Sequence, residues 1–311
     1  MPLLRLILSR LLQAVPVLLG VSVVTYLLMA ASGDPIRLLV GDRASAETVA
    51  AMRERYGLDE PLLRQYAVYL RNLVQGDLGA SLRYRVPVAD LLRSHYPVTL
   101  FLVAFTVVLT LPPVVGLAVL SARRQGGLAD QAIRLAGVLG LAVPVFWLAL
   151  LMSRLFGVTL GWLPVSGFGE GPVGHLRHLL LPALSTAIWV VPILTRNLRA
   201  ALLDELGRDY VLTGLSKGLG ERAVFRAHVF PNSLLSTISL FGLVVAYLLG
   251  GSVIVETVYA VPGMGKLMVE SILARDYYVV QGATLVFALT TILVMLATDL
   301  ASAWVDPRAA A

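Results

Sequence analysis

The sequence predicts an all-α protein that crosses a membrane six times. Of its 311 residues, 58% are hydrophobic and 14% are charged, whereas soluble domains contain roughly 45–50% and about 25%. Six stretches have the length of about 20 mostly apolar residues that a helix needs to cross a bilayer. Their backbone groups can be satisfied in lipid only within helices. These stretches cover residues 11–31, 97–120, 135–156, 179–195, 234–255 and 281–304.

Two of these stretches have unusual features. The first, 11–31, follows two arginines and so resembles a secretory signal, but this mostly apolar run of 21 residues is longer than the roughly 7–15 of a cleaved signal. We therefore expect a retained anchor. The fourth, 179–195, is short and contains Pro182 and Pro192, which we expect to kink the helix.

Lysine and arginine are distributed unequally between the two sides. Twelve lie in the segments of one side, which are 1–10, 121–134, 196–232 and 305–311. Three lie in the short segments of the other side, 157–178 and 256–280. Because cytoplasmic loops are rich in these residues, this distribution predicts that both termini are cytoplasmic. The outer segment 32–96 carries nine arginines, but long segments cross a membrane largely regardless of charge.

The outer segment 32–96 is expected to form a small extracytoplasmic helical subdomain. Apolar residues recur at helical spacing between Leu62 and Leu73, and the Gly57–Pro61 stretch separates two helices. The subdomain is either a solvated cap on the membrane domain or a ligand-binding unit. The remaining spans are expected to form a five-helix core over 97–304, with the loop 196–232 within it.

The loop 196–232 is too long to be a tight connection. Its leucines, together with Tyr210 and Val211, predict short amphipathic turns that Gly214, Gly218 and Gly220 interrupt. A helix of this kind presses on another protein in the cytosol or lies on lipid, and composition leaves both interpretations open.

This loop resembles a known motif. Gly218 and Pro231 are thirteen residues apart, as in the EAA-x3-G-x9-I-x-L-P loop of ABC-importer permeases, and DYVLTGLSKGL (209–219) resembles its form in the dipeptide/oligopeptide/nickel branch. The similarity to that branch continues over nearly the whole chain, in GDP (33–35), YGLDEPLLRQY (56–66), GDLGASL (76–82), the segment 250–282 and DPR (306–308). The sequence therefore resembles the B-type permease subunit of such importers.

The resemblance implies a set of partners and the residues that contact one of them. The ATPase-coupling residues would be Asp209, Tyr210, Thr213, Gly214, Lys217, Gly218 and Pro231. The partners would be a homologous second permease, two cytoplasmic ATPase subunits, an extracytoplasmic substrate-binding protein and the lipid of a bacterial inner membrane. Short peptides are the expected substrate, and nickel or a metal–metallophore complex is the alternative.

The loop departs from the general motif at several positions. Leu212, Thr213 and Gly214 replace its Glu, Ala and Ala, and His228 and Phe230 replace its Ile and Leu. The peptide branch itself relaxes the glutamate, so the docking role is retained.

No catalytic residues or bound cofactor are expected in this chain. It has no cysteine, and no HExxH motif occurs. Gly265 and Lys266 suggest a phosphate-binding loop, but Ala260 stands where its leading glycine must be and Leu267 replaces its Ser/Thr. ATP and magnesium would therefore bind to the partner ATPases. The net charge of +6 is mostly arginine in membrane loops, so no nucleic-acid partner is expected.

Five ionisable residues are further candidates for function. His175 and His178 form either a metal site or an ordinary interfacial pair. Asp299, near the inner end of the last span, is expected to order that helix end together with an N-terminal arginine. Arg154 would snorkel to the interface. Glu256 would line the transport path or its outer gate.

Gly242, Ala246 and Gly250 recur at four-residue intervals in the fifth span. Small residues at this spacing allow close helix packing in lipid, either with another span of the same subunit or with the partner permease. An ion-coupled secondary transporter is a remote alternative, since internal repeats and mid-membrane ionisable groups are not evident.

Overall fold

The computed structural model describes residues 2–31, 45–55 and 59–305, which fold into helices joined by loops, with no strand among them. The helices are α1 (Pro2–Ala31), α3 (Ala46–Arg55), α4 (Leu62–Val74), α5 (Val88–Arg123), α6 (Leu128–Ala142), α7 (Val145–Met152), η1 (Ser153–Thr159), α8 (Gly171–Leu206), α9 (Asp209–Ser216), α10 (Glu221–Val224), η2 (Phe225–Val229), α11 (Phe230–Val258), α12 (Met264–Leu273) and α13 (Tyr277–Val305). Within this described part, five helices are long and apolar enough to cross a membrane, or six crossings if the bent pair of α6 and α7–η1 counts as one. The prediction of a polytopic all-α membrane protein is confirmed.

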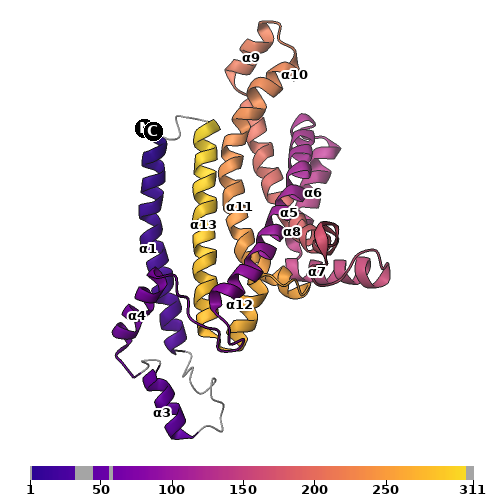
Figure 1. Cartoon of the computed structure of the whole chain (residues 1–311). Helices are drawn as coiled ribbons and strands as arrows, with labels where there is room; N and C mark the ends of the chain where they lie inside the picture. The colour runs from indigo at the N-terminus through magenta and orange to yellow at the C-terminus, as the bar shows by residue number, and fades with distance from the viewer. Residues whose placement is uncertain (1, 32–44, 56–58, 306–311) are drawn as a thin grey trace.

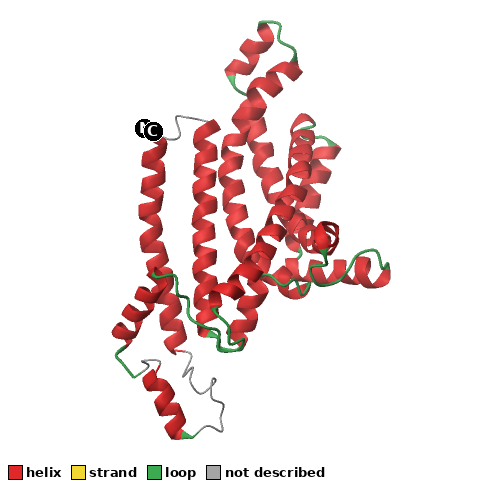
Figure 2. Cartoon of the chain, viewed as in Figure 1, coloured by secondary structure: helices red, strands yellow, loops and turns green. Residues whose placement is uncertain are grey.

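The long helices stand side by side in the order α1, α13, α11, α8 and α5 (Figure 1). Helices α9 and α10 project beyond one end of this bundle, the end at which α1 begins and α13 finishes. Helices α3 and α4 lie at the opposite end, and short loops connect most of the elements (Figure 2). The loop predicted to be cytoplasmic and the segment predicted to be extracytoplasmic therefore lie at opposite ends of the molecule.

Two spans are longer than the hydropathy pattern predicts. Helix α5 begins at Val88 rather than at 97, so the last nine residues of the segment 32–96 belong to a spanning helix. Helix α8 runs without interruption through Pro182 and Pro192, and it continues to Leu206. The added turns are buried in both helices. Val88 and Leu92 of α5 pack with residues of α12 and α13, and Leu198 and Leu202 of α8 pack with residues of α5 and α9.

The stretch 135–156, which was predicted to be one span, is sharply bent. The chain bends by 96° between Ala142, where α6 ends, and Val145, where α7 begins. Val143 has an extended conformation, which a residue before proline prefers because the proline ring disfavours the helical region. Pro144 therefore ends α6, and α7 with η1 runs across the direction of the bundle (Figure 1).

A buried carboxylate fastens the outer loop before α5 to the start of α13. Asp276 is fully buried and accepts a hydrogen bond from the hydroxyl of Ser81. It also accepts bonds from the backbone N–H groups of Leu82 and Arg83, each at 3.1 Å. Because a buried charge is costly unless it is fully bonded, this cluster fixes the loop firmly against the α12–α13 corner.

Gly242 and Gly250, two of the three small residues of the fifth span, have different surroundings. A Cβ atom on Gly242 would lie 2.0 Å from Oγ1 and 2.6 Å from Cβ of Thr298, so α11 and α13 meet closely there. Gly250 is exposed and faces open space. At Gly242 the close contact is with a span of the same subunit.

This difference predicts that a glycine-to-alanine substitution changes the Tm differently at the two positions. Gly242→Ala should lower the Tm of the purified subunit in detergent, because overpacking a close helix contact costs about 1–3 kcal/mol. Gly250→Ala should leave the Tm unchanged or raise it slightly, since alanine favours helix and no neighbour obstructs the methyl group. Equal melting of the two variants, measured by differential scanning fluorimetry, would contradict the assigned packing.

Candidate coupling helix and membrane cavity

Helix α9 (Asp209–Ser216) ends in a defined turn. Gly218 has a φ of 82°, a left-handed conformation that glycine adopts without a steric penalty. Its N–H donates to the carbonyl of Leu215 at 2.9 Å, and the N–H of Leu219 donates to the carbonyl of Gly214 at 3.2 Å. These two bonds form a Schellman motif, which terminates α9. The predicted break at Gly218 is confirmed.

One face of α9 is seated on the membrane bundle. Val211 and Val224, from α9 and α10, are buried in the same apolar cluster as Leu202 of α8. Gly214 belongs to the interior of α9, where a Cβ atom would lie 3.2 Å from Cγ2 of Val224. The prediction that Gly214 interrupts the helix is therefore wrong. Its small size instead allows α9 and α10 to approach closely.

Polar bonds hold the start of α9 at the ends of α8 and α11. The Tyr210 hydroxyl donates to Glu205 Oε2 and accepts from Asn232 Nδ2 at 3.4 Å. Burial, followed by the bond to Glu205, raises the pKa of Tyr210 above its usual value. Asp209 occupies the first turn, where its negative charge is favourable at the positive end of the helix dipole.

The outward surface of α9 is unusually apolar for a projecting helix. Leu212 is 63% exposed, and Leu215 and Leu219 are also exposed beside Lys217. The structure thus gathers most of the predicted coupling residues on one short helix. Pro231 lies apart from them, in the first turn of α11. A rigid helix with a buried base and an apolar outer face can transmit a push from another protein.

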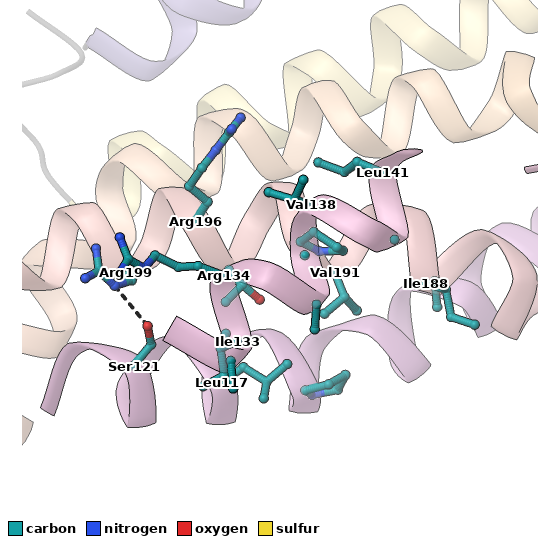
Figure 3. A pocket seen from close by; sticks show the side chains of 18 of the residues that line it. Leu117, Ser121, Ile133, Arg134, Val138, Leu141, Ile188, Val191, Arg196 and Arg199 are labelled. Atoms are coloured by element: carbon teal, nitrogen blue, oxygen red, sulfur yellow. Dashed lines mark hydrogen bonds between the residues drawn. The ribbon is translucent and has the colours of Figure 1, made fainter. Parts of the chain in front are cut away.

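A cavity of about 840 Å³ opens between α5, α6 and α8 (Figure 3). Its walls are largely apolar, and they include Leu117, Ile133, Val138, Leu141, Ile188 and Val191. Arg134, Arg196 and Arg199 lie toward the end nearest α9, together with the hydroxyl group of Ser121. The cavity therefore has an apolar body and a cationic end.

A buried ionic cluster closes the cationic end of this cavity. Asp130 of α6 is 1% exposed. Its Oδ1 accepts from Arg199 Nε of α8, its Oδ2 accepts from Arg199 Nη2, and both distances are 2.8 Å. Ser121 of α5 donates to Oδ1, and the N–H of Gly126 donates to Oδ2 at 3.0 Å. Arg134 lies within 3.7 Å of the same carboxylate.

Sequence reasoning missed this cluster. Asp130 and Arg199 are 69 residues apart, and within the sequence they are two of many charges in polar loops. The one available signal is the four-residue spacing of Asp130 and Arg134, which predicts a helical ion pair but not the partner on α8.

Glu256 occupies a closed site in this conformation. It is fully buried, and its Oε1 accepts from Thr99 at 2.7 Å and Ser252 at 3.1 Å. Its Oε2 accepts from the N–H of Lys266 at 3.0 Å, and a Cβ atom on Gly263 would lie 2.4 Å from the carboxylate. The carboxylate thus joins α5, α11 and the turn before α12, and here it does not line an open passage.

The other ionisable candidates have local roles. Arg10 Nε lies 2.7 Å from Asp299 Oδ2, so the expected pairing of Asp299 with an N-terminal arginine is confirmed. His175 stacks on Phe168 and its Nδ1 lies 3.0 Å from the Phe168 carbonyl, while His178 Nδ1 lies 2.9 Å from the carbonyl of Gly174. Each histidine is thus engaged by the backbone.

Comparison with known proteins shows the family. Residues 114–311 match the model of the binding-protein-dependent transport system inner membrane component, and residues 3–103 match the N-terminal model of the same membrane component. A putative peptide transport system permease protein of Brucella suis is 39% identical over 307 residues, covering 97% of this chain and 98% of that protein.

Two further relatives have similar coverage. The oligopeptide transport system permease protein AppB of Bacillus subtilis is 37% identical over 309 residues, covering 97% of this chain and 98% of its own. The glutathione transport system permease protein GsiC of Escherichia coli K12 is 35% identical over 302 residues, covering 97% of each chain. The chain therefore belongs to the inner-membrane components of binding-protein-dependent transport systems, as a multi-pass permease subunit of the peptide/nickel branch of ABC importers.

Proposed function

We propose that this permease imports short peptides, pairs with a homologous second permease and is driven by two separate cytoplasmic ATPase subunits. An extracytoplasmic binding protein delivers the substrate. The observation that carries the proposal is the construction of α9, whose base is buried against α8 and α10 while Leu212 and Leu215 remain exposed. That surface suits a socket on another protein, because exposed apolar patches commonly mark interaction sites.

ATP and magnesium bind to the partner subunits in this proposal, and this chain contributes no hydrolytic site. The ATPases contact α9 and the turn that follows it, and Pro231 lies in the first turn of α11, the helix to which the movement is passed. The contacting residues are Asp209, Tyr210, Thr213, Gly214, Lys217 and Gly218. ATP binding turns the passage outward and hydrolysis resets it. Both chain termini lie in the cytoplasm with α9, in agreement with the excess of lysine and arginine at that end.

The cavity between α5, α6 and α8 would form this subunit's part of the passage. Its polar groups are three arginines and the hydroxyl groups of Ser121 and Thr195. Arg199 and Arg134 already face Asp130, so Arg196 supplies the fork that would match a peptide carboxylate, and the apolar walls accommodate peptide side chains. Nickel and its complexes are the second candidate, but a bare metal cation prefers imidazole, carboxylate or thiolate ligands. The lining therefore favours a peptide.

Coupling is tested by placing a charge on the outer face of α9. Leu212→Asp should leave the subunit folded, because the side chain at this position is exposed. It should abolish ATPase stimulation by the loaded binding protein, because the contact between α9 and the ATPase would have to bury a charge. Leu128→Asp is the matched control, since Leu128 is 86% exposed at the start of α6. Hydrolysis and uptake in proteoliposomes give the readout. Normal stimulation in the Leu212→Asp complex would remove α9 from the coupling interface.

Topology is tested with single cysteines in a chain that has none of its own. Val74→Cys, on α4 at a position that is 88% exposed, should react with an impermeant maleimide from outside spheroplasts. Gln125→Cys, in the exposed turn between α5 and α6, should react only after the membrane is permeabilised. The opposite pattern would reverse the proposed orientation.

Substrate class is tested with the reconstituted complex and its binding protein. Di- to pentapeptides should stimulate hydrolysis and accumulate in the vesicles, whereas Ni²⁺ and its histidine chelate should do neither. Stimulation by nickel alone would replace the peptide assignment with the metal one.

A further inference from the structure

We propose that Asp130 is a positioning residue for transport coupling: it joins α6, one wall of the cavity, to the helix that carries α9. The inference rests on the proposed function, since it concerns how a push on α9 reaches the passage. It assigns a role to the cluster of Asp130, Arg199 and Ser121, which lies outside α9 at the cationic end of the cavity.

The first step of the argument is the attachment of α6. This helix packs chiefly on α8 and α5. In its membrane half the contact is made through small residues, since a Cβ atom on Gly137 would lie 3.3 Å from Pro192 Cβ and one on Gly140 would lie 3.4 Å from the Ile188 carbonyl oxygen. At the end nearest α9, α6 is attached to α8 by the bond between Asp130 and Arg199.

The second step is the rigidity of that bond. The Arg199 guanidinium approaches the carboxylate with two N–H groups, and its Nε also donates to Ser121 Oγ at 2.9 Å. Two-point pairing fixes orientation as well as distance. Separating α6 from α8 here would leave the carboxylate buried without its counter-ion, which is strongly unfavourable. The ends of α5, α6 and α8 therefore move as one body.

The third step is the connection from this body to α9. Arg199 precedes Leu202 by less than one helical turn, and Leu202 shares an apolar cluster with Val211 of α9 and Ala122 of α5. The ionic cluster of Asp130, Arg199 and Ser121 is thus joined through α8 to the apolar cluster on which α9 is seated. A displacement of α9 therefore carries α6, and with it this wall of the cavity, along with α5 and α8 as one body.

The principal test compares coupling in reconstituted complexes. Asp130→Asn should lower substrate transported per ATP hydrolysed about tenfold, within the usual range of coupling effects, while basal hydrolysis continues. Asp204→Asn is the matched control, because Asp204 is an exposed aspartate on the same end of α8. It should keep the wild-type ratio. Arg199→Lys, which retains the charge and loses the fork, should also lower the ratio and serves if the Asp130 variant does not assemble.

A distance measurement tests the rigid-body step without altering the cluster. Spin labels on Leu135→Cys of α6 and Arg208→Cys at the start of α9, both exposed, should show one distance in the nucleotide-free and the ATP-trapped complex with an intact cluster. In the Asp130→Asn background the distribution should widen. The inference would be overturned if the distance in the complex with an intact cluster changed between the two nucleotide states. It would also be overturned if the Asp130→Asn or Arg199→Lys complex, whichever assembles, transported as much substrate per ATP as the wild type. Absence of any transport by the wild-type complex would instead count against the proposed function.

Discussion

In a bilayer, apolar side chains gain little free energy by leaving lipid for one another, so polar bonds and close packing decide how helices are placed. Three carboxylates serve this purpose here. Asp130, Glu256 and Asp276 are each at most 1% exposed, and each accepts at least one bond from an element distant in the sequence. The long helices form the body of the molecule, and these three carboxylates fix how the helices and their connecting loops are placed relative to one another.

The two ends of the molecule differ in what these groups hold. At the end that carries α12, Glu256 and Asp276 bind the segments around α12 to α5 and to the loop before α5. At the other end, Asp130 binds helix termini together directly beneath α9. The cavity lies between these fixed regions, so its shape depends on how α5, α6 and α8 stand relative to one another rather than on flexible loops.

Hydropathy and local motifs predicted the parts of this structure that depend on neighbouring residues. The spans, the glycine stop at Gly218 and the pairing of Asp299 with an N-terminal arginine all follow from composition, spacing or charge placement. The bend at Pro144 carried a local signal too, but a continuous apolar stretch concealed it, because hydropathy records the environment of a segment and not its direction. The interior place of Gly214 depends on Val224, ten residues later.

The bond between Asp130 and Arg199 lay beyond sequence reasoning for a different reason. Many arginines occupy the polar loops of this chain, and nothing local distinguishes the one that a buried aspartate selects. That choice is made by the packing of α6 on α8, which is itself set by Gly137 and Gly140. The size and chemistry of the cavity likewise depend on three helices at once, so they emerge only from the assembled fold.

Helix α1 touches the other spans mainly through α13, and the pair formed by Arg10 and Asp299 reinforces that single seam. The five later crossings share one contact network in which α1 takes little part. The molecule is therefore modular: α1 meets the other spans along one seam, so sequence changes on the rest of its surface leave the packing of the helices around the cavity unaltered.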